Sequence, residues 1–201
     1  MKNELIIGIV VVFVVIFVLE IFLKARIRKT LTTSLINDDL AAFDSIRNNR
    51  FTMLLLPRND LFYFDLQKAV ALKDNQLIDK TIRRLESLKL TDSQKKTIYS
   101  TAFYHYLSLE DAVHIEPYYQ KLSELKGSDG ITEEDVLYDV YAKKGHKYLD
   151  YVLDLYEKAA IDKKASLELL LAKIYENLAD KKKADEYFKK AKQRLNRQTT
   201  A

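Results

Sequence analysis

An unbroken apolar run opens the chain, and segments of mixed apolar and polar positions follow it. Leu5 to Leu23 reads LIIGIVVVFVVIFVLEIFL, in which Glu20 is the only charged residue. A helix of this length spans about 28 Å, close to the hydrocarbon thickness of a bilayer. The run therefore predicts a transmembrane helix, with Glu20 near one end and paired to Lys24 one turn later.

The flanks of this run favour an uncleaved anchor over a cleaved signal peptide. The segment before it is short and carries Glu4 as well as Lys2, and no small-x-small cleavage pattern follows it. The basic residues after the run predict that the larger part faces the cytoplasm. We therefore predict a single-pass protein of the inner or plasma membrane with a cytoplasmic C-terminal domain. The predicted anchor residues are Leu5, Phe13, Phe17, Leu23, Lys24, Arg26, Arg28 and Lys29.

Five polar turn signals recur along the rest of the chain. They lie near Asp38, Asp74, Glu110, Gly145 and Asp180, at spacings of 36, 36, 35 and 35 residues. A period just above thirty-four predicts a series of about five helical hairpins. Apolar or aromatic side chains eight residues after each turn face mostly apolar ones eight residues before it, as paired helices require. The two sets are Ile46, Ile82, Tyr118, Leu153 and Phe188, and Thr30, Leu66, Ala102, Leu137 and Ala172.

The last hairpin, Ala165 to Arg194, resembles the tetratricopeptide repeat. Tyr175, Ala184, Phe188 and Ala191 stand at its characteristic offsets of nine, four and three, although Glu168 replaces its first large residue. The resemblance, which extends to small anchored repeat proteins of bacteria, implies an all-α right-handed solenoid in which these four residues pack. It also implies a concave groove, lined by the first helix of each hairpin, that binds segments of other proteins. The implied groove residues are Asp135, Asp139, Lys143, Ser166, Leu169, Lys173, Glu176 and Asn177.

These patterns divide the chain into three parts. We predict an anchor with a basic collar at residues 1–29, a tetratricopeptide-like domain at 30–197 and a disordered tail at 198–201. Neither glycine nor proline separates the apolar run from the first predicted hairpin. One continuous helix is therefore expected to join them.

The amino-acid composition provides few candidates for a catalytic, cofactor-binding or metal-binding site. The chain has no cysteine and four glycines, which excludes a thiolate metal site and leaves no material for a phosphate-binding loop. His105, His114 and His146 are too far apart in sequence for a local ligand set. We therefore predict no catalytic, cofactor or metal site and no enzymatic activity. A structural subunit of a membrane complex, or an enzyme with a non-local active site, remains an alternative.

Aromatic and basic residues leave two further questions open. Thirteen tyrosines and nine phenylalanines can serve as core wedges or as a groove floor. The C-terminal lysines form either a solvated end cap or a contact for anionic lipid or an acidic protein. Nucleic acid is not favoured, because the middle of the chain is acidic. The predicted function is a membrane-anchored scaffold for a protein partner, and the lysines concerned are Lys181, Lys182, Lys183, Lys189, Lys190 and Lys192.

Overall fold

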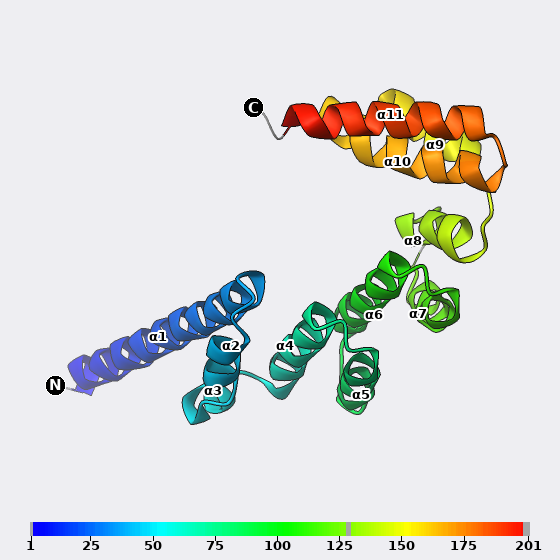
Figure 1. Ribbon diagram of the computed structural model, residues 1–201. Helices are drawn as coiled ribbons and strands as arrows, with labels where there is room; N and C mark the ends of the chain where they lie inside the picture. Colours follow the sequence, from blue (N-terminus) through cyan, green and yellow to red (C-terminus); the bar gives the residue numbers. More distant parts are fainter. Residues whose placement is uncertain (1, 128–129, 199–201) are drawn as a thin grey trace. The chain divides into compact units, whose positions relative to one another are not determined.

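Every regular element in the described part of the chain is helical (Figure 1). The computed structural model describes the backbone of residues 2–127 and 130–198, and the side chains of residues 13–127 and 130–197. The prediction of an all-α protein is confirmed. The chain divides into two compact units, residues 1–98 and 99–201, each of which is considered by itself.

Unit 1 consists of five helices and the beginning of a sixth. Its long first helix packs against the three that follow it, and Leu31, Phe43, Leu61 and Phe64 meet in the core between them. The first helix is continuous from the apolar run into the first hairpin, as the sequence predicts. The elements are α1 (Lys2–Ile36), α2 (Leu40–Arg47), α3 (Arg50–Leu55), α4 (Arg58–Ala71), α5 (Asn75–Glu86) and α6 (Asp92–Ser108), whose second half belongs to unit 2.

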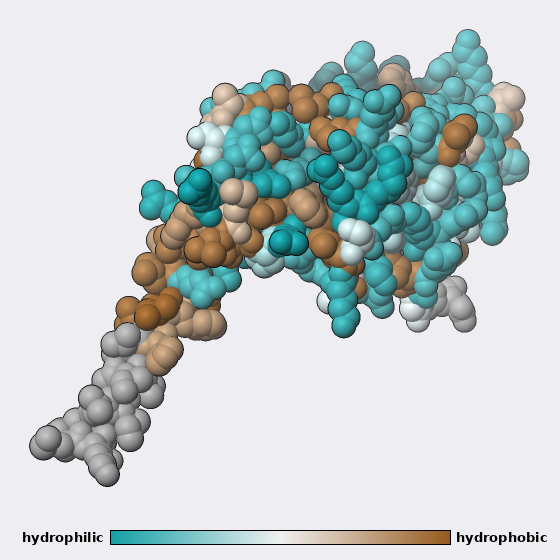
Figure 2. Space-filling view, turned by 90° about the horizontal axis from the view of Figure 1, so that it is seen from below, coloured by the Kyte–Doolittle hydropathy of each residue, from teal (hydrophilic) through white to brown (hydrophobic). Residues whose placement is uncertain are grey.

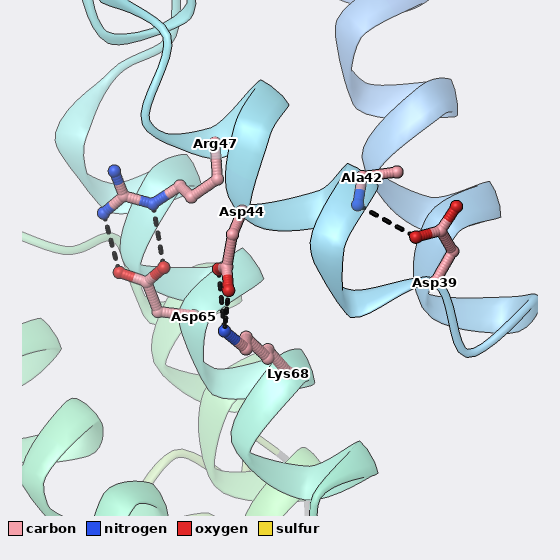
Figure 3. Close-up of polar contacts among 6 residues, drawn as sticks. All are labelled: Asp39, Ala42, Asp44, Arg47, Asp65 and Lys68. Atoms are coloured by element: carbon pink, nitrogen blue, oxygen red, sulfur yellow. Dashed lines mark hydrogen bonds and ion pairs between the residues drawn. The ribbon is translucent and has the colours of Figure 1, made fainter.

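Two ion pairs join α2 to α4 in unit 1 (Figure 3). The guanidinium of Arg47 donates two hydrogen bonds to the carboxylate of Asp65, at 2.8 and 2.7 Å. One helical turn further along, Lys68 Nζ lies 2.7 Å from both carboxylate oxygens of Asp44 and over the ring of Phe43. Because the Arg47 pair is bidentate, it fixes the rotation of α2 about its axis as well as its distance from α4.

Unit 2 is built around α10. Residues Val136, Val140, Val152, Leu171 and Ile174 form its core, and α10 packs along α11, as Figure 1 shows in orange and red. The elements after α6 are α7 (Ala112–Glu124), α8 (Glu133–Leu137), the π-helix η1 (Tyr138–Ala142), α9 (Leu149–Lys158), α10 (Ile161–Asn177) and α11 (Lys181–Gln198).

The aromatic residues of unit 2 serve mainly as core. Phe103 and Tyr106 of α6 are fully buried, and Tyr118 of α7 stacks on Tyr106 at a centroid distance of 5.8 Å. Tyr138 is also buried and stacks on Tyr119 at 3.9 Å, which joins η1 to α7. Stacked and edge-on rings contribute packing energy beyond their buried area.

Five residues in the described chain adopt the left-handed backbone conformation, and all five lie at the predicted hairpin turns. Their φ angles are 50° to 58°, and they follow one another at intervals of 34 to 37 residues. Each lies within one residue of a turn position that the sequence predicts, so the predicted period of the turns is confirmed. They are Asp38, Lys73, Glu110, Lys144 and Ala179.

An aspartate follows the left-handed residue in four of these turns and serves both adjoining helices. Its backbone N–H donates to the carbonyl five residues earlier, at 2.8 to 3.1 Å, which closes the first helix. Its side chain accepts a hydrogen bond from a backbone N–H in the first turn of the next helix, at 2.9 to 3.3 Å. These aspartates are Asp39, which Figure 3 shows bonded to Ala42, and Asp74, Asp111 and Asp180.

The turn between η1 and α9 departs from this pattern. Gly145 stands where the other turns have aspartate, and its N–H donates to the carbonyl of Asp139, six residues earlier, at 2.8 Å. The extra residue reflects the wider π-helix that precedes the turn. Asp139 Oδ2 accepts from the backbone N–H of Lys147 at 2.9 Å, so the carboxylate that organises this turn comes from the helix before it.

The predicted localisation requires correction. No helix among the residues whose side chains are described is long and apolar enough to cross a membrane. Residues up to 12, including the predicted anchor residue Leu5, lie outside the described side chains. The prediction of a single-pass protein of the cell membrane with a cytoplasmic C-terminal domain is contradicted.

The other predicted anchor residues have the following positions. Phe13 and Phe17 are exposed, at 68% and 62%, and hydrophobic residues gather along α1 in Figure 2. Lys24 pairs with Glu20 at 2.5 Å, as the spacing predicts. Arg28 binds Asp60 of α4 at 2.6 Å, so it fixes α1 within unit 1. Leu23 is half-buried, whereas Arg26 and Lys29 are exposed.

The turn at Gly145 leads to a prediction about stability. A Cβ added at Gly145 would lie 2.5 Å from Asp139 Oδ1, whereas one added at Gly127 would meet nothing within 4 Å. Gly145→Ala must displace the Asp139 carboxylate from Lys147 and is expected to lower the free energy of unfolding by about 1–2 kcal/mol. Gly127→Ala is the control, and urea denaturation measures both. Equal stability of the two variants would contradict the role given to Asp139.

Candidate functional site

Two adjoining cavities lie along α10 in unit 2. The first, of about 660 Å³, lies between α10 and α11 and reaches Glu110 and η1. The second, of about 620 Å³, lies among α8, η1, α9 and α10. Both are lined by Tyr141 and Leu169, so the two cavities adjoin at these side chains, and we call the pair of cavities the α10 groove.

The first half of the α10 groove has an apolar floor. Ala172 of α10 and Ala184 of α11 line it, and their small side chains leave space above the contact between the two helices. Leu169 and Phe188 stand at its sides and are 38% and 56% exposed. Large apolar side chains with this exposure next to a concavity mark a binding surface more often than an ordinary surface position.

Charged residues at the edge of this half hold one another in place. Lys144 Nζ lies 2.9 Å from Glu110, and Lys173 Nζ lies 3.5 Å from Glu110 and 3.2 Å from Glu176. The hydrogen bond from Lys144 lowers the pKa of Glu110. Burial by itself would lower the pKa of Lys173, but its contacts with Glu176 and Glu110 outweigh burial and raise it. Glu110 and Lys173 therefore keep their charges at neutral pH.

The second half of the α10 groove is more apolar. Leucines and valines of α8, α9 and α10 line it, with Tyr141 and Tyr151 beside them. Burial raises the pKa of Tyr141, so that its hydroxyl stays protonated and available as a hydrogen-bond donor. Tyr141 belongs to the π-helix, a distortion that is frequent at functional sites. This half can take apolar side chains and one hydrogen-bond acceptor.

Four of the eight predicted groove residues line the α10 groove. Leu169 lines both halves, Lys173 and Glu176 line the first, and Ser166 lines the second, where its hydroxyl donates to the carbonyl of Lys163. Their assignment as partner contacts stays a prediction. It rests on the resemblance to the tetratricopeptide repeat, which implies that the first helix of each hairpin lines the groove.

The other four predicted residues make internal contacts. Asn177 Nδ2 donates to the carbonyls of Val140, at 2.9 Å, and Gly145, at 3.0 Å, and thereby ties the end of α10 to η1. Lys143 Nζ lies 4.9 Å from the ring centre of Tyr138, and Asp139 organises the turn at Gly145. Asp135 is buried. These positions support the walls of the groove rather than line it.

Asp135 is the centre of a buried polar cluster at the start of α8. Its carboxylate accepts hydrogen bonds from Tyr119 at 2.9 Å, from Lys126 at 2.7 Å and from the backbone N–H of Thr132 at 2.8 Å. Burial alone would raise the pKa of this carboxyl group, but the hydrogen bonds from Lys126, Thr132 and Tyr119 outweigh burial and lower it to about 2. Asp135 therefore fixes α8 against α7 as an anion.

Glu168 has a structural role that the sequence analysis did not foresee. It is fully buried, and its carboxylate accepts hydrogen bonds from Tyr156 at 2.8 Å and from Arg194 Nε at 2.8 and 3.0 Å. Through these contacts Glu168 joins α9, α10 and α11. The sequence shows a charged residue where the repeat family has a large side chain. It does not show the partner of Glu168, because Arg194 lies 26 residues away.

The residues that carry the resemblance to the repeat family have two different positions. Tyr175 and Ala191 are buried, as predicted. Ala184 is only half-buried and Phe188 is exposed, and both line the α10 groove. The prediction that Phe188 packs inside the fold is wrong, because no described helix follows α11 to cover this side of it.

The three histidines have separate surroundings. His105 is buried on α6, His146 is exposed, and His114 Nδ1 lies 2.7 Å from Asp111 Oδ2 at the start of α7. Within the described residues, no group of three or more histidine, cysteine or carboxylate side chains is arranged to hold a metal ion.

Comparisons with known proteins identify no family. The chain matches no protein-family model, no curated protein and no solved structure. The resemblance to the tetratricopeptide repeat stays a prediction. The function is therefore argued from the geometry of the α10 groove.

The lowered pKa of Asp135 leads to a prediction about pH. A folded-state pKa of about 2, below the usual aspartate value of 3.8, adds stability above about pH 4 that disappears as the pH falls through about 2. Between pH 5 and pH 2 the wild type should lose about 2 kcal/mol more unfolding free energy than Asp135→Asn. Asp150→Asn, exposed on α9, is the control and should follow the wild type. Urea denaturation at a series of pH values measures the difference, and parallel curves for wild type and Asp135→Asn would disprove it.

Proposed function

We propose that unit 2 is a protein-interaction module of tetratricopeptide type, and that it binds a segment of a partner protein in the α10 groove. The observation that carries this proposal is that two cavities adjoin along α10 at Tyr141 and Leu169. Two adjoining cavities with apolar linings and charged edges suit an extended or helical segment better than a compact small molecule.

The identity of the helices that line the groove supports the same proposal. The segment formed by α8 and η1 and the helix α10 are the first helices of two successive hairpins, and both line the groove. In repeat proteins of this kind the first helices contribute much of the concave binding surface. Here the second helices, α9 and α11, complete the groove walls, and the contacts of Glu168 with α9 and α11 and of Asn177 with η1 hold the walls in place.

The rigidity of the walls also supports binding. The hydrogen bonds that Asn177 donates, and those that Asp139 and Asp135 accept, hold η1 and α8 in place before any partner arrives. A surface that is already ordered loses little conformational entropy on association, so more of the contact energy contributes to affinity. The exposed side chains of Leu169 and Phe188 are the candidates for the main apolar contacts.

Site-specific photo-crosslinking of the full chain tests this function. A photoreactive phenylalanine derivative at position 169 should give one or a few discrete crosslinked products in cells that make the protein. The same residue at position 72 is the control, because Leu72 is 44% exposed in unit 1 and Leu169 is 38% exposed. Products that are absent at 169, or identical at both positions, would refute a partner in the α10 groove.

Leu169→Glu provides a second measurement. The charge would occupy the apolar floor and should abolish crosslinking from a photoreactive residue placed at position 172, whereas Leu72→Glu should leave it unchanged. Circular dichroism at matched temperature verifies that both variants are folded. Retained crosslinking from position 172 in Leu169→Glu would place the partner elsewhere.

A further inference from the structure

The outer face of α11 carries a regular set of exposed side chains. Lys181, Asp185, Phe188, Lys192 and Leu195 are spaced at intervals of three or four residues, which places them on one side of the helix. Phe188 and Leu195 are 56% and 44% exposed, and Lys181 and Phe188 line the α10 groove. The face therefore carries Phe188 at its middle, with Lys181 and Asp185 on one side of it and Lys192 and Leu195 on the other.

The lysines of α11 fall into two groups. Lys183 lies over the ring of Tyr175, and Lys190 pairs with Glu186 at 2.7 Å and lies over Tyr187, so both are engaged inside unit 2. Lys181, Lys182, Lys189 and Lys192 form no hydrogen bond or ion pair with another residue of the described chain. Of these four, Lys181 and Lys192 share the face of α11 that carries Phe188, so their charges are available to a partner on that face.

The shape of the surface favours a helix as the occupant. Leu169 and Phe188 come from two adjacent antiparallel helices and stand beside one depression between them. A helix that packs across two helices places its own apolar stripe into such a depression, with charged residues at its edges. Pairing of an extended strand would need an exposed sheet edge, and the described elements include no strand.

The charges argue against two other occupants. A second copy that packed its α11 antiparallel against this face would bring Lys181 of one copy near Lys192 of the other, and like charges would repel. A flat bilayer surface could reach the lysines, but it could not fill the depression that Leu169 and Ala172 line. An acidic amphipathic helix can fill the depression with its apolar side chains and pair its carboxylates with the lysines.

We propose that the partner segment is an acidic amphipathic helix, whose apolar stripe packs against Leu169 and Phe188 and whose carboxylates lie near Lys181 and Lys192. These two lysines are eleven residues apart, which corresponds to about 16 Å along α11. The segment therefore carries acidic residues about three helical turns apart on the flanks of its apolar stripe. This inference rests on the proposed partner-binding role of the α10 groove.

Selection from a displayed library of helical peptides, unbiased in charge, tests the chemistry of the partner with the full chain. The peptides enriched at moderate salt should be net acidic and carry apolar residues at i, i+3 or i+4 and i+7. The selection could instead enrich neutral or basic peptides whose binding is lost in Leu169→Glu. That result would overturn the proposal of an acidic partner but would leave the proposed binding function of the α10 groove intact. Failure to enrich any peptide sensitive to Leu169→Glu would count against both.

Two matched pairs of variants test the contacts with a selected peptide. Phe188→Ala should weaken binding at least about tenfold, and Phe51→Ala, at 52% exposure in unit 1, should not. Lys181→Glu with Lys192→Glu should weaken it on the order of tenfold, and Lys80→Glu with Lys96→Glu should not, although both pairs change the net charge equally. Fluorescence anisotropy at low and moderate salt measures the affinities.

A vesicle experiment distinguishes the acidic helix from an anionic lipid surface. The full chain is sedimented with vesicles of phosphatidylcholine, with and without phosphatidylserine, in the presence and absence of the selected peptide. The proposal expects any binding to phosphatidylserine to be unaffected by Phe188→Ala. A contrary result has two parts. Vesicle binding would be lost both in Phe188→Ala and in the double variant Lys181→Glu with Lys192→Glu, while the affinity for the selected peptide would be unchanged in both. That result would overturn the proposal in favour of an anionic lipid surface.

Discussion

The hairpins depend on one recurring turn, in which a left-handed residue precedes an aspartate. A residue other than glycine in this conformation costs roughly 1–3 kcal/mol, and the cost recurs at Asp38, Lys73, Glu110, Lys144 and Ala179. In four of the turns two interactions of the aspartate offset this cost. Its backbone N–H closes one helix, and its carboxylate caps the next. The turn thereby fixes the angle between two helices without a glycine.

The turn that departs from this pattern follows the π-helix η1, whose Tyr141 lines the α10 groove. The π-helix adds a residue before Lys144, Gly145 takes the place of the aspartate, and the carboxylate of Asp139 replaces it from the preceding helix. The altered helix also carries Tyr141, which lines both halves of the groove. A local change in helical geometry is therefore associated with the surface that we propose to be functional.

Buried carboxylates then hold the helices that the turns connect. Glu168 binds Tyr156 and Arg194, and Asp135 binds Lys126, Tyr119 and Thr132. Removing one partner from such a cluster would leave a buried charge unpaired, which costs more than the pair itself contributes. The Glu168 cluster therefore fixes α9 and α11 against α10, and the Asp135 cluster fixes α8 against α7.

Much of the local structure follows from the sequence alone. Helical periodicity and turn signals predicted an all-α chain, the period of the turns and the continuity of α1, because those features depend on residues within a few positions of one another. The spacing along α10 likewise identified Leu169, Lys173 and Glu176 as neighbours on one face. Contacts between distant residues could be decided only by the tertiary structure. In the tertiary structure Glu168 is buried against Arg194, Asp135 and Asn177 make contacts inside the fold, and Phe188 is exposed. The reason is that a side chain's surroundings depend on which other helices pack against its own helix.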